Sequence, residues 1–122
     1  MKWKFPISPV AASRPRVSKW GAYFTGTYKD FRNEAKPIVT KITEGWEPTE
    51  KKLKVYVGIY PIKPKTSKLQ YPRPDVDNYA KSILDLCNGI VWKDDAQIIL
   101  LEVNKEWSKN NGYFTIEIKE IQ

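Results

Sequence analysis

The sequence predicts one α+β domain, in which a mixed sheet of about four strands packs against two main helices. Helix-like and strand-like segments follow one another along the chain, without a repeat or a linker that would divide it. A length of 122 residues is enough for one domain with a real core and too short for two. We therefore expect residues 1–122 to form a single compact domain.

The first half of the chain predicts a strand, a hairpin or loop, a helix and a second strand. Residues 1–7 are expected to form an edge strand, and the basic, aromatic residues 14–24 a loop or hairpin with a turn near Gly21. An apolar stripe predicts a helix over 28–44, with Thr27 as its N-cap, Gly45 as its stop and a bend at Pro37. Residues 52–60 alternate between apolar and polar side chains, which predicts a half-buried strand.

The second half predicts a loop, a helix and two strands. Residues 61–74 hold four prolines and four basic residues without periodicity, as is typical of a loop. A helix over about 76–87 is expected to bury Ala80, Ile83, Leu84 and Cys87 and to end at Asn88-Gly89, a pair that favours a left-handed C-cap. Strands over about 96–107 and 113–121 follow, joined by the turn signal of residues 110–112.

Charge is segregated along the chain. The formal net charge is +7, yet five of the six aspartates lie between Asp75 and Asp95. No acidic residue lies between Lys51 and Pro74, a stretch rich in lysine. A basic protein favours a polyanionic partner such as nucleic acid, because lysine and arginine release counterions when they neutralise phosphates. The alternative is a basic surface that serves only solubility.

Composition excludes several chemistries and environments. The chain has no histidine, so a Ser-His-Asp triad and a histidine-ligated zinc site are excluded. Its single cysteine, Cys87, cannot form an internal disulfide and lies in an apolar helical pattern typical of a buried free thiol. No segment has the ~20 apolar residues of a membrane span, and the first residues do not resemble a signal peptide. We expect a protein of the reducing cytoplasm.

The spacing of the aspartates predicts a site for a divalent cation. Asp75 and Asp77 lie two residues apart after Pro74, in a stretch expected to be extended, so both carboxylates can point the same way. Lys81 and Asp85 follow Asp77 at successive spacings of four, on one stripe of the helix. The pair Asp94-Asp95 returns at the start of the next strand and can close the site. Carboxylate oxygens suit Mg²⁺ or Mn²⁺, and such an ion activates water without a histidine.

Each part of this cluster also has a structural explanation. Asp77 can be a helix N-cap, Lys81 and Asp85 a surface ion pair, and Asp94-Asp95 a turn before a strand. None of these explains five aspartates within twenty-one residues of a basic protein, because carboxylates brought together repel unless a cation joins them. A receiver-like phosphoryl-transfer pocket would place its acids early and its lysine late, the reverse of the order here.

The run from Arg73 to Gly89, followed by Val91 to Ile98, resembles the signature of the RusA family of Holliday-junction resolvases. The pattern Arg14-Pro15-Arg16-Val17 and the chain length are also similar to that family, particularly to its phage and prophage members. The resemblance implies a RusA-like fold and a small, Mg²⁺-dependent, homodimeric endonuclease of DNA recombination and repair. Such an enzyme cuts four-way DNA junctions with paired, symmetric nicks. Mn²⁺ is an alternative metal.

By this resemblance, Asp75, Asp77 and Asp95 match the catalytic, metal-binding aspartates, Lys81 matches the catalytic lysine, and Asp94 matches an acidic position of lesser weight. Relatives in which a basic residue directly precedes the first aspartate differ from this chain, which has Pro74 there. The expected phosphate contacts are basic residues of the early segment and of the loop: Arg14, Arg16, Lys19, Lys63, Lys65, Lys68 and Arg73. Tyr71 and Trp92 are candidates for stacking on a base, with burial in the core as the alternative. The competing function is a basic DNA-binding or regulatory protein without catalysis.

Overall fold

A four-stranded mixed sheet forms the centre of the computed structural model, which describes residues 1–13, 16–18, 21–23 and 27–122. Its strands lie in the order β1 (Lys2–Phe5), β6 (Tyr113–Ile121), β4 (Lys52–Tyr60) and β5 (Ile98–Lys105). β4 runs antiparallel to β6 and parallel to β5, while β1 pairs antiparallel with β6. The expected mixed α+β sheet is therefore confirmed, with β1 at one edge as predicted.

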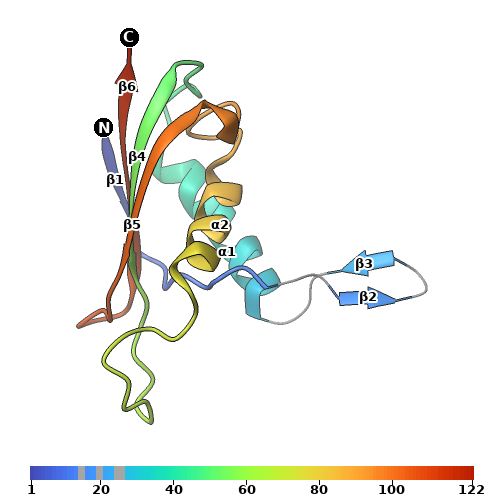
Figure 1. The fold of residues 1–122 in the computed structure, drawn as a ribbon, viewed down its shortest axis with the longest axis vertical. Coiled ribbons are helices and arrows are strands. Elements are labelled where there is room, and N and C mark those ends of the chain that lie inside the picture. Colours follow the sequence, from blue (N-terminus) through green and yellow to red (C-terminus); the bar gives the residue numbers. More distant parts are fainter. Residues whose placement is uncertain (14–15, 19–20, 24–26) are drawn as a thin grey trace.

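Both main helices lie on the same side of this sheet, as Figure 1 shows for α1 (Thr27–Ile42) and α2 (Val76–Cys87). The alternation of β4 explains this arrangement. Leu53, Val55, Val57 and Ile59 are buried, whereas Lys52 and Lys54 are exposed. Since successive side chains of a strand point to opposite faces, the apolar face packs on the helices and the other face stays open.

The basic early segment contains two short paired strands. β2 (Arg16–Ser18) pairs antiparallel with β3 (Gly21–Tyr23), so the hairpin alternative holds for these residues. They form a separate two-stranded sheet, which Figure 1 shows apart from the main one. Gly21, near which the turn is predicted, begins β3, and residues 19–20 before it lie outside the described residues.

Three helix details differ from the sequence prediction. α1 already includes Thr27, so this residue is not its N-cap, and the helix ends at Ile42 with Gly45 at a φ of +90° after it. Ile42 is 38% exposed, because the buried face of α1 passes through Phe31, Ala35 and Val39 and then ends. Pro37 lies inside the helix.

α2 has the predicted bounds, but its end and its buried face are slightly different. It buries Tyr79, Ser82 and Leu86 in addition to Ala80, Ile83 and Cys87, while Leu84 is only half-buried. At the C-terminus Asn88 is extended, and only Gly89 adopts the left-handed conformation, with a φ of +82°. The expected glycine stop is therefore present at Gly89, whereas Asn88 before it has an extended backbone.

The last two strands are joined by the predicted turn but do not pair with each other. Gly112 has a φ of +83°, as the turn requires, yet β4 lies between β5 and β6. β5 also begins later than expected, because residues Asp95–Gln97 form a 3₁₀ turn, η1. The physical reason for the separation is burial: Phe114, Ile116 and Ile118 of β6 fill the core, whereas Ile99, Leu100 and Leu101 of β5 are exposed at the edge. Within the described residues, no helix is long and apolar enough to cross a membrane.

Candidate active site

Asp75 and Asp77 lie at the start of α2. Asp75 is the N-cap residue and is extended (φ −64°, ψ 147°), and its carbonyl accepts the first helical hydrogen bonds from Asn78 and Tyr79. Its carboxylate makes no capping hydrogen bond. Asp77 lies inside the first turn, so the interpretation of Asp77 as an N-cap is wrong. Both side chains are exposed, and neither is needed to close the helix end.

A lysine on β5 holds the chain in front of this motif. The ammonium of Lys105 donates hydrogen bonds to the carbonyls of Pro72 (2.8 Å) and Pro74 (2.7 Å). Nearby, the indole N–H of Trp107 donates to the carbonyl of Leu69 (2.9 Å). These contacts connect the loop of residues 61–74 to the end of β5 and fix the residue that precedes Asp75. No local sequence pattern predicts this role of Lys105, since the contacts span more than thirty residues.

One groove collects three aspartates and a lysine. It has a volume of about 530 Å³ and lies between α2 and β5; its polar lining residues are Asp77, Lys81, Asp85 and Asp95. Apolar side chains, among them Leu84 and Leu101, form the rest of its wall. Asp85 therefore joins the predicted residues, whereas Asp75 lies at the helix start and does not line the groove. Among the described residues Lys81 has no ion-pair partner, so the alternative explanation of Lys81 and Asp85 as a surface ion pair is not borne out.

Asp95 is the most firmly held acid of the groove. Its Oδ1 accepts a hydrogen bond of 2.5 Å from the indole N–H of Trp92, and its backbone N–H donates to Oδ1 of Asn88 (3.1 Å). Partial burial raises the pKa of Asp95, the bond from Trp92 opposes that shift, and the nearby charges of Asp85 and Asp94 raise the pKa further. Trp92 is fully buried, so burial in the core is confirmed for this residue and stacking on a base is not. Instead it orients Asp95 from the core.

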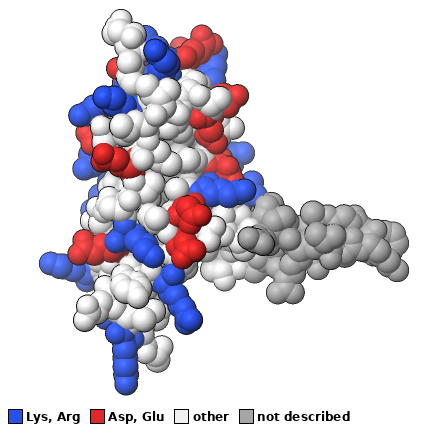
Figure 2. All heavy atoms as spheres, in the orientation of Figure 1, with Lys and Arg blue, Asp and Glu red and all other residues white. Residues whose placement is uncertain are grey.

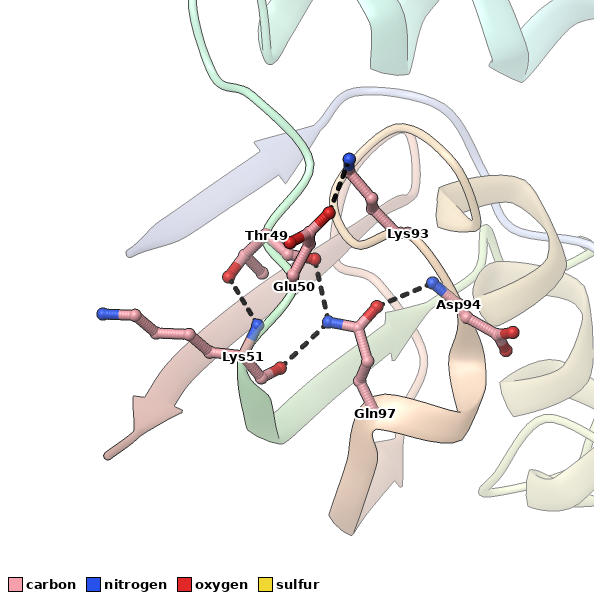
Figure 3. Close-up of polar contacts among 6 residues, drawn as sticks. All are labelled: Thr49, Glu50, Lys51, Lys93, Asp94 and Gln97. Atoms are coloured by element: carbon pink, nitrogen blue, oxygen red, sulfur yellow. Dashed lines mark hydrogen bonds and ion pairs between the residues drawn. The ribbon is translucent and has the colours of Figure 1, made fainter.

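Asp94 has a local structural role. It is the N-cap of η1: its carboxylate accepts from the N–H of Ala96 (2.9 Å), and its own N–H donates to Oε1 of Gln97 (2.8 Å). Figure 3 shows how Gln97 also bridges to the strand β4, because its amide group donates to the carbonyls of Thr49 (2.8 Å) and Lys51 (2.9 Å). The turn that carries Asp95 is thus attached to the start of β4.

The donor set of the groove fits a hard divalent cation, because carboxylate oxygens are the ligands that Mg²⁺ and Mn²⁺ prefer. Within the part of the chain that the structure describes, no three acidic side chains are already close enough together to hold one ion. Asp75, Asp77 and Asp85 are exposed and hold no capping bond or ion pair among these residues. They are therefore available as ligands, and rotation of exposed side chains could gather them.

The predicted DNA-binding residues fall into two groups. Lys63, Lys65, Lys68 and Arg73 are exposed on the loop that precedes α2. Arg16 lies in β2, and Arg14 and Lys19 lie outside the described residues. Tyr71 is 59% exposed on the same loop, so its stacking on a base stays a prediction. Figure 2 shows acidic and basic side chains interspersed over this view, with one acidic group near its centre next to basic side chains.

The fold and groove define a small α+β protein with an acidic site surrounded by cationic segments, a class suited to acting on nucleic acid. Comparison with known proteins gives the family. The chain belongs to the family of endodeoxyribonuclease RusA, whose sequence profile matches residues 6–119. A stretch of 37 residues is also 46% identical to the uncharacterized protein YqaN of Bacillus subtilis (strain 168). That stretch covers 30% of this chain and 26% of YqaN, so the match spans about a quarter of that relative.

Proposed function

We propose that this protein is a Mg²⁺-dependent endodeoxyribonuclease that resolves four-way DNA junctions by paired, symmetric nicks. The observation that carries the proposal is the groove of Asp77, Lys81, Asp85 and Asp95 in a chain of the RusA endodeoxyribonuclease family. The reaction is hydrolysis of a phosphodiester bond. Its cellular context would be DNA recombination and repair in the cytoplasm of a bacterium or a phage-infected bacterium.

Asp75, Asp77 and Asp95 are the residues that would hold the metal, with Asp85 beside them. Mg²⁺, or Mn²⁺ in its place, supplies Lewis-acid chemistry and lowers the pKa of water when bound. Asp95 is preorganised for such a role, because Trp92 fixes one of its carboxylate oxygens and the residue lines the groove. Asp94 contributes less in this proposal, since its carboxylate already caps η1.

Lys81 acts on the phosphate. Its ammonium lies in the same groove as the aspartates and has no ion-pair partner among the described residues. A cation beside a phosphate in the transition state offsets the negative charge that develops on its oxygens. Lys81→Ala should therefore lower the cleavage rate while leaving junction binding nearly intact.

DNA binding would use the exposed basic loop and the early basic segment. Lys63, Lys65, Lys68 and Arg73 lie on the loop that leads to Asp75 and can contact phosphates near the cleaved bond. Symmetric cleavage of two strands requires two sites related by a two-fold axis, so the active form would be a homodimer.

The test is cleavage of a labelled four-way junction and a matched linear duplex, with Mg²⁺ or with EDTA. Wild-type protein should nick only the junction, in opposed strands and only with metal. Asp75→Asn should abolish nicking and keep binding, whereas the same substitution at Asp30, an exposed aspartate of α1 outside the groove, should leave nicking unchanged. Cleavage that persists in Asp75→Asn would contradict the assignment of the site.

A second candidate is a DNA-binding protein that does not cut. The observation that favours it is that no three carboxylates of the described residues are already gathered for one ion. This alternative predicts junction binding without cleavage in any divalent metal, and the same assay decides between the two.

A further inference from the structure

Helix α1 carries a basic stripe on the side that adjoins α2. The stripe consists of Lys29, Arg32 and Lys36, with Asn33 among them. Spacings of three and four residues place these side chains next to one another on one face of the helix, and all of them are exposed. The buried face of α1 uses other positions, so packing does not require this stripe.

The stripe lines a cleft between the two helices. This cleft has a volume of about 450 Å³, and α2 and the residue after it contribute Asp85, Leu86 and Asn88. Asp85 also lines the acidic groove that contains Lys81 and Asp95. The cleft and the acidic groove therefore share Asp85, so the basic stripe lies next to the candidate active site.

Cationic side chains outnumber carboxylates among the residues that line the cleft. Three cationic side chains and one carboxylate, that of Asp85, line the cleft. Lys29 and Lys36 have no ion-pair partner among the described residues. The acids of α1 in this region, Asp30 and Glu34, do not line the cleft. The cleft thus carries an excess of positive charge.

We propose that this stripe binds the phosphates of the DNA strand next to the bond that is cut. The inference rests on the proposed function, since it assumes DNA in the adjoining groove. Lys29 and Lys36 lie seven residues apart, which is about 10 Å along a helix axis. One DNA strand rises about 3.4 Å per phosphate along the duplex axis, so this length matches roughly three phosphate steps. Asn33 and Asn88 add amide donors for phosphate oxygens.

The test compares two pairs of lysines with the same change in charge. Lys29→Gln/Lys36→Gln removes two charges from the stripe. Lys52→Gln/Lys54→Gln removes two charges from exposed positions on β4, on the open face of the sheet opposite the helices. Binding of each variant to a labelled four-way junction is measured in EDTA over a range of salt concentrations.

The stripe variant should bind on the order of 10-fold more weakly at low salt, and the slope of log affinity against log salt should fall in magnitude by about 2. The β4 variant should bind within about twofold of wild type. An equal loss in both variants would mean that only total charge matters and would overturn the proposal. Unchanged binding and an unchanged slope in the stripe variant would overturn it as well. The single variants Lys29→Gln and Lys36→Gln should each give about half of the slope change, and their melting temperatures check the fold.

Cleavage separates this inference from the proposed function. Wild-type protein that binds junctions but cuts nothing in Mg²⁺ or Mn²⁺ would contradict the proposed function, while a selective loss of binding in the stripe variant would still support the inference. Normal cleavage by wild type, together with unchanged binding by the stripe variant, would overturn the inference alone.

Discussion

Asp95 shows, at the scale of one residue, how a candidate catalytic acid can oppose stability. Its pKa in the folded protein is raised by desolvation, against the lowering effect of the Trp92 hydrogen bond, and is raised further by Asp85 and Asp94. A carboxyl group with a raised folded pKa binds its proton more readily in the folded state than in the unfolded state. Folding stability from this group therefore falls as pH rises from the unfolded pKa through the folded pKa.

We expect Asp95→Asn to be more stable than wild type at pH 7 in EDTA, by less than about 1 kcal/mol because solvent screens this half-exposed group. The amide oxygen can still accept the hydrogen bond from Trp92. The gain should disappear as pH falls below the unfolded pKa, where Asp95 is protonated in both states. Urea unfolding across pH measures it, with cleavage lost in the same variant. An Asp95→Asn protein that is less stable at pH 7 would contradict this account.

Cys87 should be inert in the native protein. The thiol is fully buried, and burial raises its pKa far above the usual range, with an added effect from the charge of Asp95. A thiolate is needed for alkylation or disulfide exchange. Native protein at pH 8 should therefore leave a thiol reagent unreacted over the time in which urea-unfolded protein reacts completely. Rapid reaction in the native state would mean that α2 opens readily.

The site residues that could be predicted from the sequence are those that form a local pattern of spacing. Asp75, Asp77 and Lys81 share one helix start, and the spacing of four along α2 places Asp77, Lys81 and Asp85 in one groove, as the structure shows. The roles of Lys105 and of the Trp92 indole depend on where a neighbouring element or buried ring lies. Such contacts are set by tertiary packing, which residue spacing does not encode.

At the scale of elements, hydrogen bonds from Gln97 hold η1 to the residues just before β4. Gln97→Ala removes three hydrogen bonds, two to the carbonyls of Thr49 and Lys51 and one from the N–H of Asp94. We expect a loss of about 1–2 kcal/mol in the free energy of unfolding, because one partly buried and two exposed hydrogen bonds are lost together. Cleavage should also fall, since the turn that positions Asp95 is loosened. Urea unfolding and a cleavage assay measure both effects.

Gln70→Ala is the matched control, because Gln70 is exposed on the loop before α2. It should leave both stability and cleavage within experimental error. Equal stability of Gln97→Ala and wild type would show that the hydrogen bonds of Gln97 drawn in Figure 3 do not hold the turn in place.

The order of elements was predictable, but their pairing was not fully so. Periodicity and proline content gave β4, α2 and β6 with the observed bounds. The turn at residues 110–112 is typical of a hairpin, yet β4 separates β5 from β6. β4 pairs with β5 along one edge and with β6 along the other. Which strands become neighbours depends on how the apolar side chains of all strands fill the core. The order of strands therefore depends on the whole sheet, and the sequence of a single segment does not predict it.

At the scale of the whole molecule, the helical side carries the features proposed to act on DNA. The acidic groove lies between α2 and β5, and the basic stripe of α1 adjoins it. The loop of residues 61–74 leads into α2 and is held to the end of β5 by Lys105. The opposite face of the sheet carries no helix (Figure 1). DNA is therefore expected to approach from the helical side, and each protomer to present one groove to one strand.

One groove per protomer leads to a prediction about the number of cuts. In a mixed dimer of wild-type and Asp75→Asn protomers, only one protomer keeps all the proposed metal ligands, so only one strand of a junction should be nicked. Two purification tags isolate the mixed dimer, and a cruciform plasmid reports the products: nicked circles from one cut, linear molecules from two. We expect wild-type dimers to give mostly linear product and mixed dimers to give mostly nicked circles. The result follows from the two-fold relation between sites that symmetric resolution requires. Linear product from the mixed dimer at the wild-type rate, or resolution by a protein that stays monomeric on DNA, would show that one groove can cut both strands in turn.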